Sequence, residues 1–287
     1  MRWVLVLSFA GCGRIGFVPV DNGSDAGVTP DAAAILAQPF GTPTLLSILS
    51  TPGTDDDPSL TNDLLEIYYE SSTPGITASQ RPTGGSPWGP PATVPVLDVA
   101  TCGENQFNVS GDGLSLFFAC TDAGGTSTLY SASRPDRSAS WSVPQPISEL
   151  ANGDLDQDPY PSRDGSWIYF YSNRGLTAGT SVWVAKRPAP GAPFAAPENV
   201  PSLGDAQALW VSEDELVTYF ESSRTGNRDI YFATRASRAD PFGPAQPLAE
   251  INTLLFEEDP WLSTDLRLMI FSKETVPGDR DLYIATR

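Results

Sequence analysis

The sequence predicts an all-β fold, a five-bladed β-propeller closed by a strand from the N-terminal end of the chain. Three observations support this prediction. The chain holds five repeats of about 50 residues, each repeat holds short strand-like runs, and the run missing from the last repeat lies before the first. Equivalent positions of the repeats are separated by 49, 52, 49 and 52 residues, and they are Pro58, Phe107, Pro159, Ala208 and Pro260.

Each repeat predicts four strands in one order. A first run leads to a turn that contains Asp, and a second run is β-branched and aromatic, as in Trp167 to Ser172. A third run follows a Gly turn, as in Ile230 to Arg235, and a Pro-rich link then leads to a short fourth run. Proline is tolerated in that run because an outermost strand has one free edge. Four strands in about 50 residues are typical of one propeller blade.

The fifth repeat ends after its third run, at Leu282 to Arg287. Its missing fourth run is expected at Pro39 to Leu46, because this segment mirrors Pro241 to Leu248 of the fourth repeat. Pairing of the two ends would close the ring and remove exposed strand edges. We therefore expect residues 39–287 to form one domain.

Composition and charge exclude several classes of protein. Only 18% of the 287 residues are charged, while 25 are glycine and 27 are proline, which excludes a helical bundle. A formal net charge of −18 argues against nucleic-acid binding, which needs a basic surface. The chain has no histidine, so a Ser-His-Asp triad, a His-ligated zinc site and a His general base are all excluded.

The N-terminus predicts export and anchoring. Residues 1–11 are expected to be a signal peptide, because a charged start precedes an apolar run that is shorter than the roughly 20 residues of a membrane span. Phe9 to Cys12 resembles a bacterial lipobox, which implies lipidation at Cys12 and attachment to the outer membrane of the cell envelope, on its periplasmic or surface side. Residues 12–38 are then a lipidated cysteine and a flexible stalk. The alternative is a chance apolar N-terminus with an ordinary core cysteine.

Two further cysteines, Cys102 and Cys120, flank a predicted hairpin turn at 111–113. The hairpin brings them roughly opposite each other, and an oxidising envelope compartment would allow a disulfide. The alternative is that both are small buried apolar residues.

The repeat core from Asp158 to Arg174 resembles the PD40, or TolB-like, propeller repeat of bacterial envelope proteins. The family's Ser-x-Asp-Gly turn is kept at 110–113 and 162–165, while the other three repeats keep the Asp and lose the Gly. The resemblance implies a propeller fold, but this repeat serves scaffolds, binding surfaces and enzymes alike. The recurrent turn aspartates are expected to be structural, and they are Asp63, Asp112, Asp164, Asp214 and Asp265.

Acidic residues precede the first strand of every repeat, near one mouth of the expected channel. Carboxylate oxygens suit a hard cation such as Ca²⁺, and no other cofactor is expected. The candidate ligands are Asp57, Glu104, Asp156, Asp158, Asp205 and Asp259. The alternative is that the last acid of each group caps a turn.

The aromatic residues offer a second kind of candidate. Most tryptophans are expected to pack between blades, but Trp210 and Trp261 lie on innermost strands and are candidates for stacking against a ligand. A glycosidase would need converging carboxylates, for which Asp57, Asp158 and Asp259 are the candidates. These residues obey the repeat symmetry, whereas a catalytic set normally breaks it, so we expect no enzymatic activity.

The sequence therefore predicts a monomeric, lipid-anchored scaffold that binds an envelope protein through its mouth loops and does no chemistry. It touches the membrane through its lipid alone and binds no nucleic acid. The alternative is a carbohydrate-binding protein or glycoside hydrolase that uses the acidic central channel.

Overall fold

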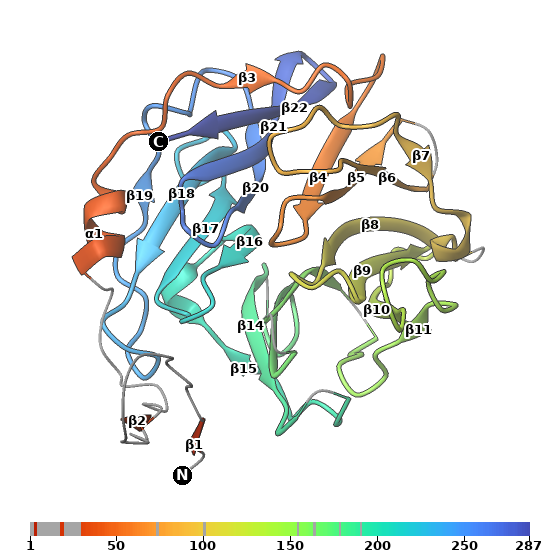
Figure 1. Cartoon of the computed structure of the whole chain (residues 1–287). Coiled ribbons are helices and arrows are strands. Elements are labelled where there is room, and N and C mark those ends of the chain that lie inside the picture. The colour runs from red at the N-terminus through yellow and green to blue at the C-terminus, as the bar shows by residue number, and fades with distance from the viewer. Residues whose placement is uncertain are drawn as a thin grey trace, which may run out of the picture.

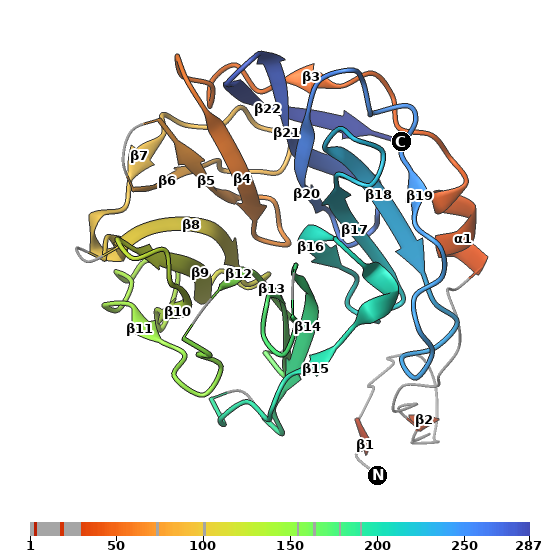
Figure 2. The same ribbon diagram turned by 180° about the vertical axis from the view of Figure 1, so that it is seen from behind.

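The computed structural model describes residues 3–4, 18–19 and 30–287, apart from 73–74, 100–101, 154, 163–164, 178 and 190. The chain forms five four-stranded antiparallel sheets that follow one another around a central axis (Figures 1 and 2). This arrangement confirms the predicted five-bladed propeller. Cys12 and most of the predicted signal peptide and stalk lie outside the described residues. Of residues 1–29, only the short antiparallel pair β1 (Trp3–Val4) and β2 (Val18–Pro19) is described.

Blades 1 to 4 run outward from the axis in chain order, while blade 5 runs from β20 through β21 and β22 to β3. The first, innermost strands are β4 (Asp55–Leu60), β8 (Cys102–Val109), β12 (Asp156–Pro161), β16 (Gln207–Val211) and β20 (Glu257–Leu262). The second strands are β5 (Glu66–Ser71), β9 (Ser115–Asp122), β13 (Trp167–Ser172), β17 (Val217–Ser222) and β21 (Leu268–Val276). The third strands are β6 (Ile76–Gln80), β10 (Ser127–Ser133), β14 (Ser181–Lys186), β18 (Asp229–Thr234) and β22 (Asp279–Thr286).

The fourth strands have two residues each, and two short 3₁₀ turns follow such strands. The fourth strands are β7 (Ala92–Thr93), β11 (Gln145–Pro146), β15 (Glu198–Asn199), β19 (Gln246–Pro247) and β3 (Thr44–Leu45). The 3₁₀ turns are η1 (Pro95–Leu97) and η2 (Pro201–Leu203). β3 pairs with β22, so Leu45 lies opposite Tyr283 and Thr44 opposite Ile284, and the predicted closing strand is confirmed.

A short helix, α1 (Pro30–Leu36), lies within the segment that was predicted to be a flexible stalk. Proline at its first position and three alanines favour a helical turn here. Ala32, Ile35 and Leu36 are partly buried against the core, which supplies the stabilisation that a helix of this length needs. No described helix is long and apolar enough to cross a membrane.

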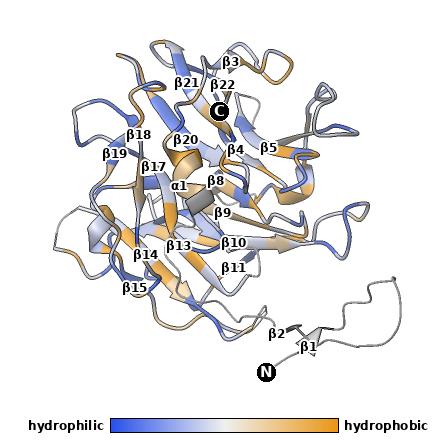
Figure 3. Cartoon of the chain, turned by 60° about the vertical axis from the view of Figure 1, so that its left-hand side comes forward, coloured by the Kyte–Doolittle hydropathy of each residue, from blue (hydrophilic) through white to orange (hydrophobic). Residues whose placement is uncertain are grey.

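The core lies between the blades. The second strands β13 and β17 are buried at every residue, because blades pack on both of their faces. Hydrophobic, orange stretches lie along the strands of the interior, where they alternate with hydrophilic, blue ones (Figure 3). The near-continuous β-branched and aromatic runs of the sequence are thus explained by burial on both sides.

The turn aspartates are structural, as predicted, in the four described copies. The Oδ1 atom of Asp112 accepts hydrogen bonds from the Ser110 hydroxyl at 2.6 Å and from the Leu114 N–H at 2.9 Å. The same pair of bonds recurs at Asp63, Asp214 and Asp265. Asp164 lies outside the described residues.

An arginine after each third strand clamps the edge of its blade. Its guanidinium lies 4.1 to 4.5 Å from the centroid of an aromatic ring in the following link. Its Nε donates to the carbonyl of a turn residue with left-handed backbone, such as Leu64 with φ of 63°. The five pairs are Arg81 with Trp88, Arg134 with Trp141, Arg187 with Phe194, Arg235 with Phe242 and Arg287 with Phe40.

Candidate functional site

A bulge in every innermost strand shapes the central channel. The register of each first strand shifts by a bulge, at one residue of which φ lies between 45° and 53°. A left-handed backbone costs about 1–2 kcal/mol for a residue other than glycine, so other contacts must hold it. The five bulge residues line the channel, and they are Asp57, Gln106, Asp158, Ala208 and Asp259.

Carboxylates of the bulge residues link one blade to the next. Asp57 Oδ2 accepts the N–H of Gln106 at 3.0 Å, and Asp158 Oδ2 accepts the N–H of Ala208 at 3.0 Å. Asp259 Oδ2 accepts the N–H of Asp57 at 3.4 Å, across the junction between the last blade and the first. These aspartates therefore orient the strained backbone of the neighbouring blade.

Two bulge residues have no carboxylate, Gln106 in blade 2 (β8 to β11) and Ala208 in blade 4 (β16 to β19). In blade 4, Glu221 on β17 takes this role, because its Oε2 accepts the N–H of Asp259 at 3.4 Å. This role of Glu221 was not predicted, because the residue lies on a second strand.

One mouth of the channel is a hollow of about 240 Å³, which we call the cup. Six acids, three glutamines and two arginines line it, so carboxylates outnumber guanidinium groups three to one. Its lining residues are Asp56, Asp57, Gln106, Gln157, Asp158, Gln207, Glu221, Arg228, Glu258, Asp259 and Arg280.

The cup is blind, because the channel closes beneath it. Pro58, Phe107, Leu209 and Pro260 surround a hollow of only about 20 Å³ below the bulge residues. At the opposite mouth the hollow measures about 30 Å³, and Asn62 Nδ2 donates across it to Glu213 Oε1 at 3.2 Å. Hollows of this size hold one or two waters.

Burial and mutual repulsion raise the pKa of several cup carboxyls. Burial, with Asp259 and Glu70 nearby, raises the pKa of Asp56 to about 8. Burial, with Asp259 nearby, raises the pKa of Asp158 to about 7. The same two causes, burial first and neighbouring carboxylates second, raise the pKa of Asp57, Glu221 and Glu258. The cup thus stores protons at neutral pH.

Two arginines stand on one side of the cup. Arg228 precedes β18 and pairs with Glu258, and its Nη1 also lies 3.7 Å from Glu221 Oε1. Arg280 on β22 pairs with the second oxygen of Glu258. Glu258 is therefore held by two guanidinium groups, while the other lining residues of the cup are acids and glutamines.

The predicted cation ligands divide into three groups. Asp57, Asp158 and Asp259 come together in the cup. Asp156 instead pairs with Arg174 at 2.6 Å, and Asp205 pairs with Arg224 at 2.9 Å, so neither faces the axis. Glu104 belongs to β8, but its side chain is outside the described residues.

The carboxylates best placed to share a cation are a different set. One oxygen each of Asp56, Asp57 and Glu70 lies within 4.8 Å of the others. Only Asp57 of these three was among the predicted ligands. Oxygen donors at this spacing would suit a hard divalent ion such as Ca²⁺.

Trp210 and Trp261 lie in the apolar part of the channel wall rather than in the cup. They are 4% and 5% exposed, and Trp210 packs edge-on against Tyr219 with ring centroids 6.1 Å apart. The hollows that they line measure about 20 and 30 Å³, which is less than a sugar ring needs.

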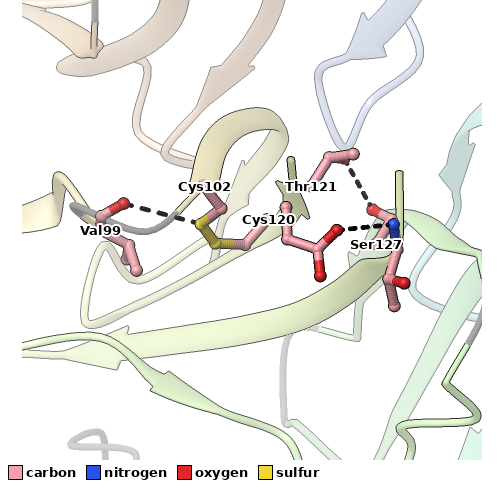
Figure 4. The surroundings of a disulfide bond; sticks show 7 residues. Val99, Cys102, Cys120, Thr121 and Ser127 are labelled. Carbon is pink, nitrogen blue, oxygen red and sulfur yellow. Dashed lines mark hydrogen bonds between the residues drawn. A yellow bond between two sulfur atoms is a disulfide. The ribbon is translucent and has the colours of Figure 1, made fainter. Parts of the chain in front are cut away.

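Cys102 and Cys120 form a disulfide between β8 and β9, with Cα atoms 5.5 Å apart (Figure 4). Cys102 lies opposite Asp122 and Cys120 opposite Glu104, so the two cysteines are diagonal rather than directly opposite. Of the two alternatives left by the sequence, the structure has the disulfide.

No protein-family model matches the chain, and no curated protein matches it. Solved structures of similar shape include a thermostable family-43 glycoside hydrolase, at 14% identity and a TM-score of 0.58, covering 84% of this chain and 92% of that one. TolB from Acinetobacter baumannii has 16% identity and a TM-score of 0.52, covering 85% of this chain and 56% of that one. A GH43_1 enzyme from Xanthomonas citri, solved with xylotriose, has 15% identity and a TM-score of 0.57, covering 84% and 92%. Identities this low establish a shared fold, and TolB-like and hydrolase propellers share it.

Proposed function

We propose that this protein is a non-catalytic binding scaffold, anchored in the cell envelope through Cys12, that holds a partner protein against the cup. The observation that carries the proposal is the use of Asp57, Asp158 and Asp259, which each accept a backbone N–H of the next blade. These were the carboxylates that a glycosidase would have used. Because these carboxylate oxygens already bind backbone N–H groups of the strained bulges, their role is structural.

The charge of the cup indicates the chemistry of the partner. Six acids face two arginines in a hollow with low-polarity walls beneath it, and several of these acids hold protons at neutral pH that a bound cation would displace. A lysine or arginine side chain of a partner would find carboxylates on the wall opposite Arg228 and Arg280. We therefore propose a partner with an exposed basic segment.

Apolar side chains surround the cup on the same face. Leu254 is 97% exposed in the loop before β20, and Val276 is 55% exposed at the end of β21. Leu176, which follows β13, is 39% exposed. Apolar contacts around a charged centre would add affinity to the selectivity that the charges supply.

The anchor and the cup lie at opposite faces in this proposal. The N-terminal segment joins the propeller at the far end of β22, where Gly41 N–H donates to Thr286 O at 2.8 Å. Arg280, at the other end of β22, lines the cup. A chain tethered through its N-terminus would thus present the cup away from the membrane.

Site-specific photocrosslinking tests the proposal. A photoreactive residue replaces Leu254 or Val276 on the cup face, and Val143, which is 69% exposed in the link after β10, serves as the matched control. In envelopes of the native host we expect one reproducible protein adduct from the two cup-face positions and none from position 143. The double variant Glu221→Gln, Glu258→Gln should lower the yield several-fold. Equal adducts from both faces, or none from an anchored protein, would contradict the proposal.

A glycoside hydrolase is the second candidate, and one observation favours it. The pKa of Asp158 near 7 suits a proton donor at neutral pH, and Asp56, Glu221 and Glu258 break the repeat symmetry of the cup. Release of nitrophenol from 4-nitrophenyl β-xyloside or α-arabinofuranoside tests it. Turnover that disappears in Asp158→Asn would establish a hydrolase and overturn the scaffold, whereas we expect no turnover above a buffer blank.

A further inference from the structure

Two grooves lie at the outer rim of the propeller, away from the channel. The groove between blades 2 and 3 measures about 400 Å³, and the one between blades 3 and 4 about 330 Å³. Equivalent positions line both, because Phe117 pairs with Ser131 across β9 and β10 as Tyr169 pairs with Val184 across β13 and β14. The repeat gives both grooves one geometry, so a difference in side chains between them is informative.

Blade 2 carries three serines at positions where the other blades carry other side chains, most of them larger. Ser115 and Ser133 are paired across β9 and β10, next to the pair Phe117 and Ser131, so all four face the same groove. The corresponding positions hold no serine in the other four blades. Those positions are Glu66, Tyr68, Ala78 and Gln80; Trp167, Tyr169, Val184 and Lys186; Val217, Tyr219, Phe232 and Thr234; and Leu268, Ile270, Ile284 and Thr286.

The hydroxyls of these serines are available to a ligand. Ser115 uses its backbone N–H to bond Ser110 Oγ, and Ser133 uses its backbone N–H to bond Ser142 Oγ. Among the described residues, no protein group takes a hydrogen bond from, or gives one to, the hydroxyls of Ser115, Ser131 or Ser133. Ser115 and Ser131 are half-buried and Ser133 is exposed, so all three hydroxyls are open to a ligand in the groove.

The charged groups of the groove are already engaged by the protein. Arg187 stacks over Phe194 at 4.5 Å, and Glu149 Oε1 accepts the Phe194 N–H at 3.3 Å. One positive and one negative group leave the groove without net charge, in a chain that carries −18 overall. Pro146 and Ile147 add apolar C–H surface along the wall.

We propose that the groove between blades 2 and 3 binds a small neutral saccharide of one or two sugar units, independently of the cup. Its volume of about 400 Å³ falls within the range of small-molecule sites. Serine hydroxyls donate and accept hydrogen bonds, as sugar hydroxyls do, and the apolar wall matches the C–H face of a sugar ring. The groove between blades 3 and 4 lacks this chemistry, since Val184 and Lys186 replace two of the serines.

Ligand-observed NMR with cellobiose, maltose and N-acetylglucosamine tests the inference. Wild-type protein should bind at least one of them saturably. The double variant Ser131→Val, Ser133→Lys installs the side chains that blade 3 already accommodates, so it should fold and bind at least tenfold more weakly. Val184→Ser, in the neighbouring groove, is the matched control and should leave the affinity unchanged.

Two outcomes would overturn the inference. One is the absence of binding of all three saccharides to wild-type protein, and the other is equal affinity in wild type and the double serine variant. Glu221→Gln, Glu258→Gln should bind saccharide normally, so failure at the cup and failure at the groove are distinguishable.

Discussion

At the residue scale, the bulge aspartates have one function that geometry defines. Each bulge residue adopts a left-handed backbone, and a carboxylate of the preceding blade accepts the N–H of four of them, which are Asp57, Gln106, Ala208 and Asp259. The hydrogen bond requires an oxygen atom but not a charge, and burial raises the pKa of Asp158 to about 7. The two requirements can be separated by substitution.

We predict that Asp158→Ala lowers the free energy of unfolding by about 1–3 kcal/mol, because the half-buried Ala208 N–H loses its acceptor. Asp158→Asn keeps an amide oxygen in place and should remain within about 0.5 kcal/mol of wild type. Gln157→Ala, beside it on the cup wall, is the control. Guanidinium unfolding at pH 7 measures all three, and an Asn variant as unstable as the Ala variant would refute the hydrogen-bond role.

A second residue-scale prediction concerns the arginine clamps. Arg134 pairs with Glu66 at 2.5 Å, and both side chains are almost fully buried, whereas no described acid pairs with Arg81. Arg134→Met should cost about 3–5 kcal/mol, because it leaves a buried carboxylate unpaired. Arg81→Met should cost about 1–2 kcal/mol for the lost stacking and carbonyl contacts.

A double-mutant cycle isolates the ion pair in this second case. Adding Glu66→Gln to Arg134→Met should recover part of the lost stability, since the uncompensated charge is removed. If the two changes were simply additive, the cost would belong to the stacking on Trp141 rather than to the pair.

At the element scale, the disulfide stabilises the inner hairpin of blade 2. It joins residues 18 positions apart on β8 and β9, at the cup end of these strands. Chain-entropy arguments give about 3 kcal/mol for a loop of this length. We predict that dithiothreitol lowers the unfolding midpoint of wild type to that of a Cys102→Ser, Cys120→Ser variant, which itself should not respond. A thiol titration that shows full reduction without a shift would contradict this.

Element patterns also explain which site residues the sequence could predict. Asp156 and Asp158 are two positions apart and would share a face of a regular strand. The bulge breaks this alternation, so Asp158 faces the axis while Asp156 turns to Arg174. Three cup residues were not predicted, and they are Glu221, Arg228 and Arg280. They lie on second strands, on third strands or in the loops between them. Their side chains reach the cup only because these hairpins extend to the mouth of the channel. The signal for Glu221 is that blade 4 has Ala208 where three other blades have an aspartate, and that it carries a glutamate on its second strand instead.

At the scale of the whole molecule, closure depends on the N-terminal strand. β3 covers the edge of β22, and Phe40 packs under Arg287, so both ends of the chain meet in blade 5. The sequence predicted this closure, because the last repeat lacks a fourth strand and a matching segment precedes the first repeat.

We predict that a chain starting at residue 47 self-associates, since the edge of β22 is left open. A chain starting at residue 30 keeps α1 and β3 and should remain monomeric with the full-length unfolding midpoint. Light scattering after gel filtration distinguishes them, and addition of a peptide of residues 30–46 should restore the monomer. A monodisperse chain from residue 47 with unchanged stability would show that the ring closes without β3.

The carboxyl groups of the cup should make the stability of the whole protein depend on pH. Asp56 and Asp158 have folded pKa values of about 8 and 7 against an ordinary 3.8, so the folded protein binds more protons than the unfolded chain between these values. Their stabilising contribution is complete below about pH 4 and is lost as pH rises through 7 to 8. We therefore expect a higher melting temperature at pH 5.5 than at pH 8.5, with a smaller difference in Asp56→Asn, Asp158→Asn.

Millimolar Ca²⁺ sharpens the same measurement. A cation shared by Asp56, Asp57 and Glu70 would replace the stored protons, so its stabilising effect should be large at pH 8.5, small at pH 5.5 and absent after Asp57→Asn. Mg²⁺ at equal concentration is the control for general screening, because it fits irregular carboxylate sites less well. No shift with Ca²⁺ at pH 8.5 would leave protons and the two arginines as the counter-charges of the cup, with a basic side chain of the partner as the further group that could balance its excess of acids.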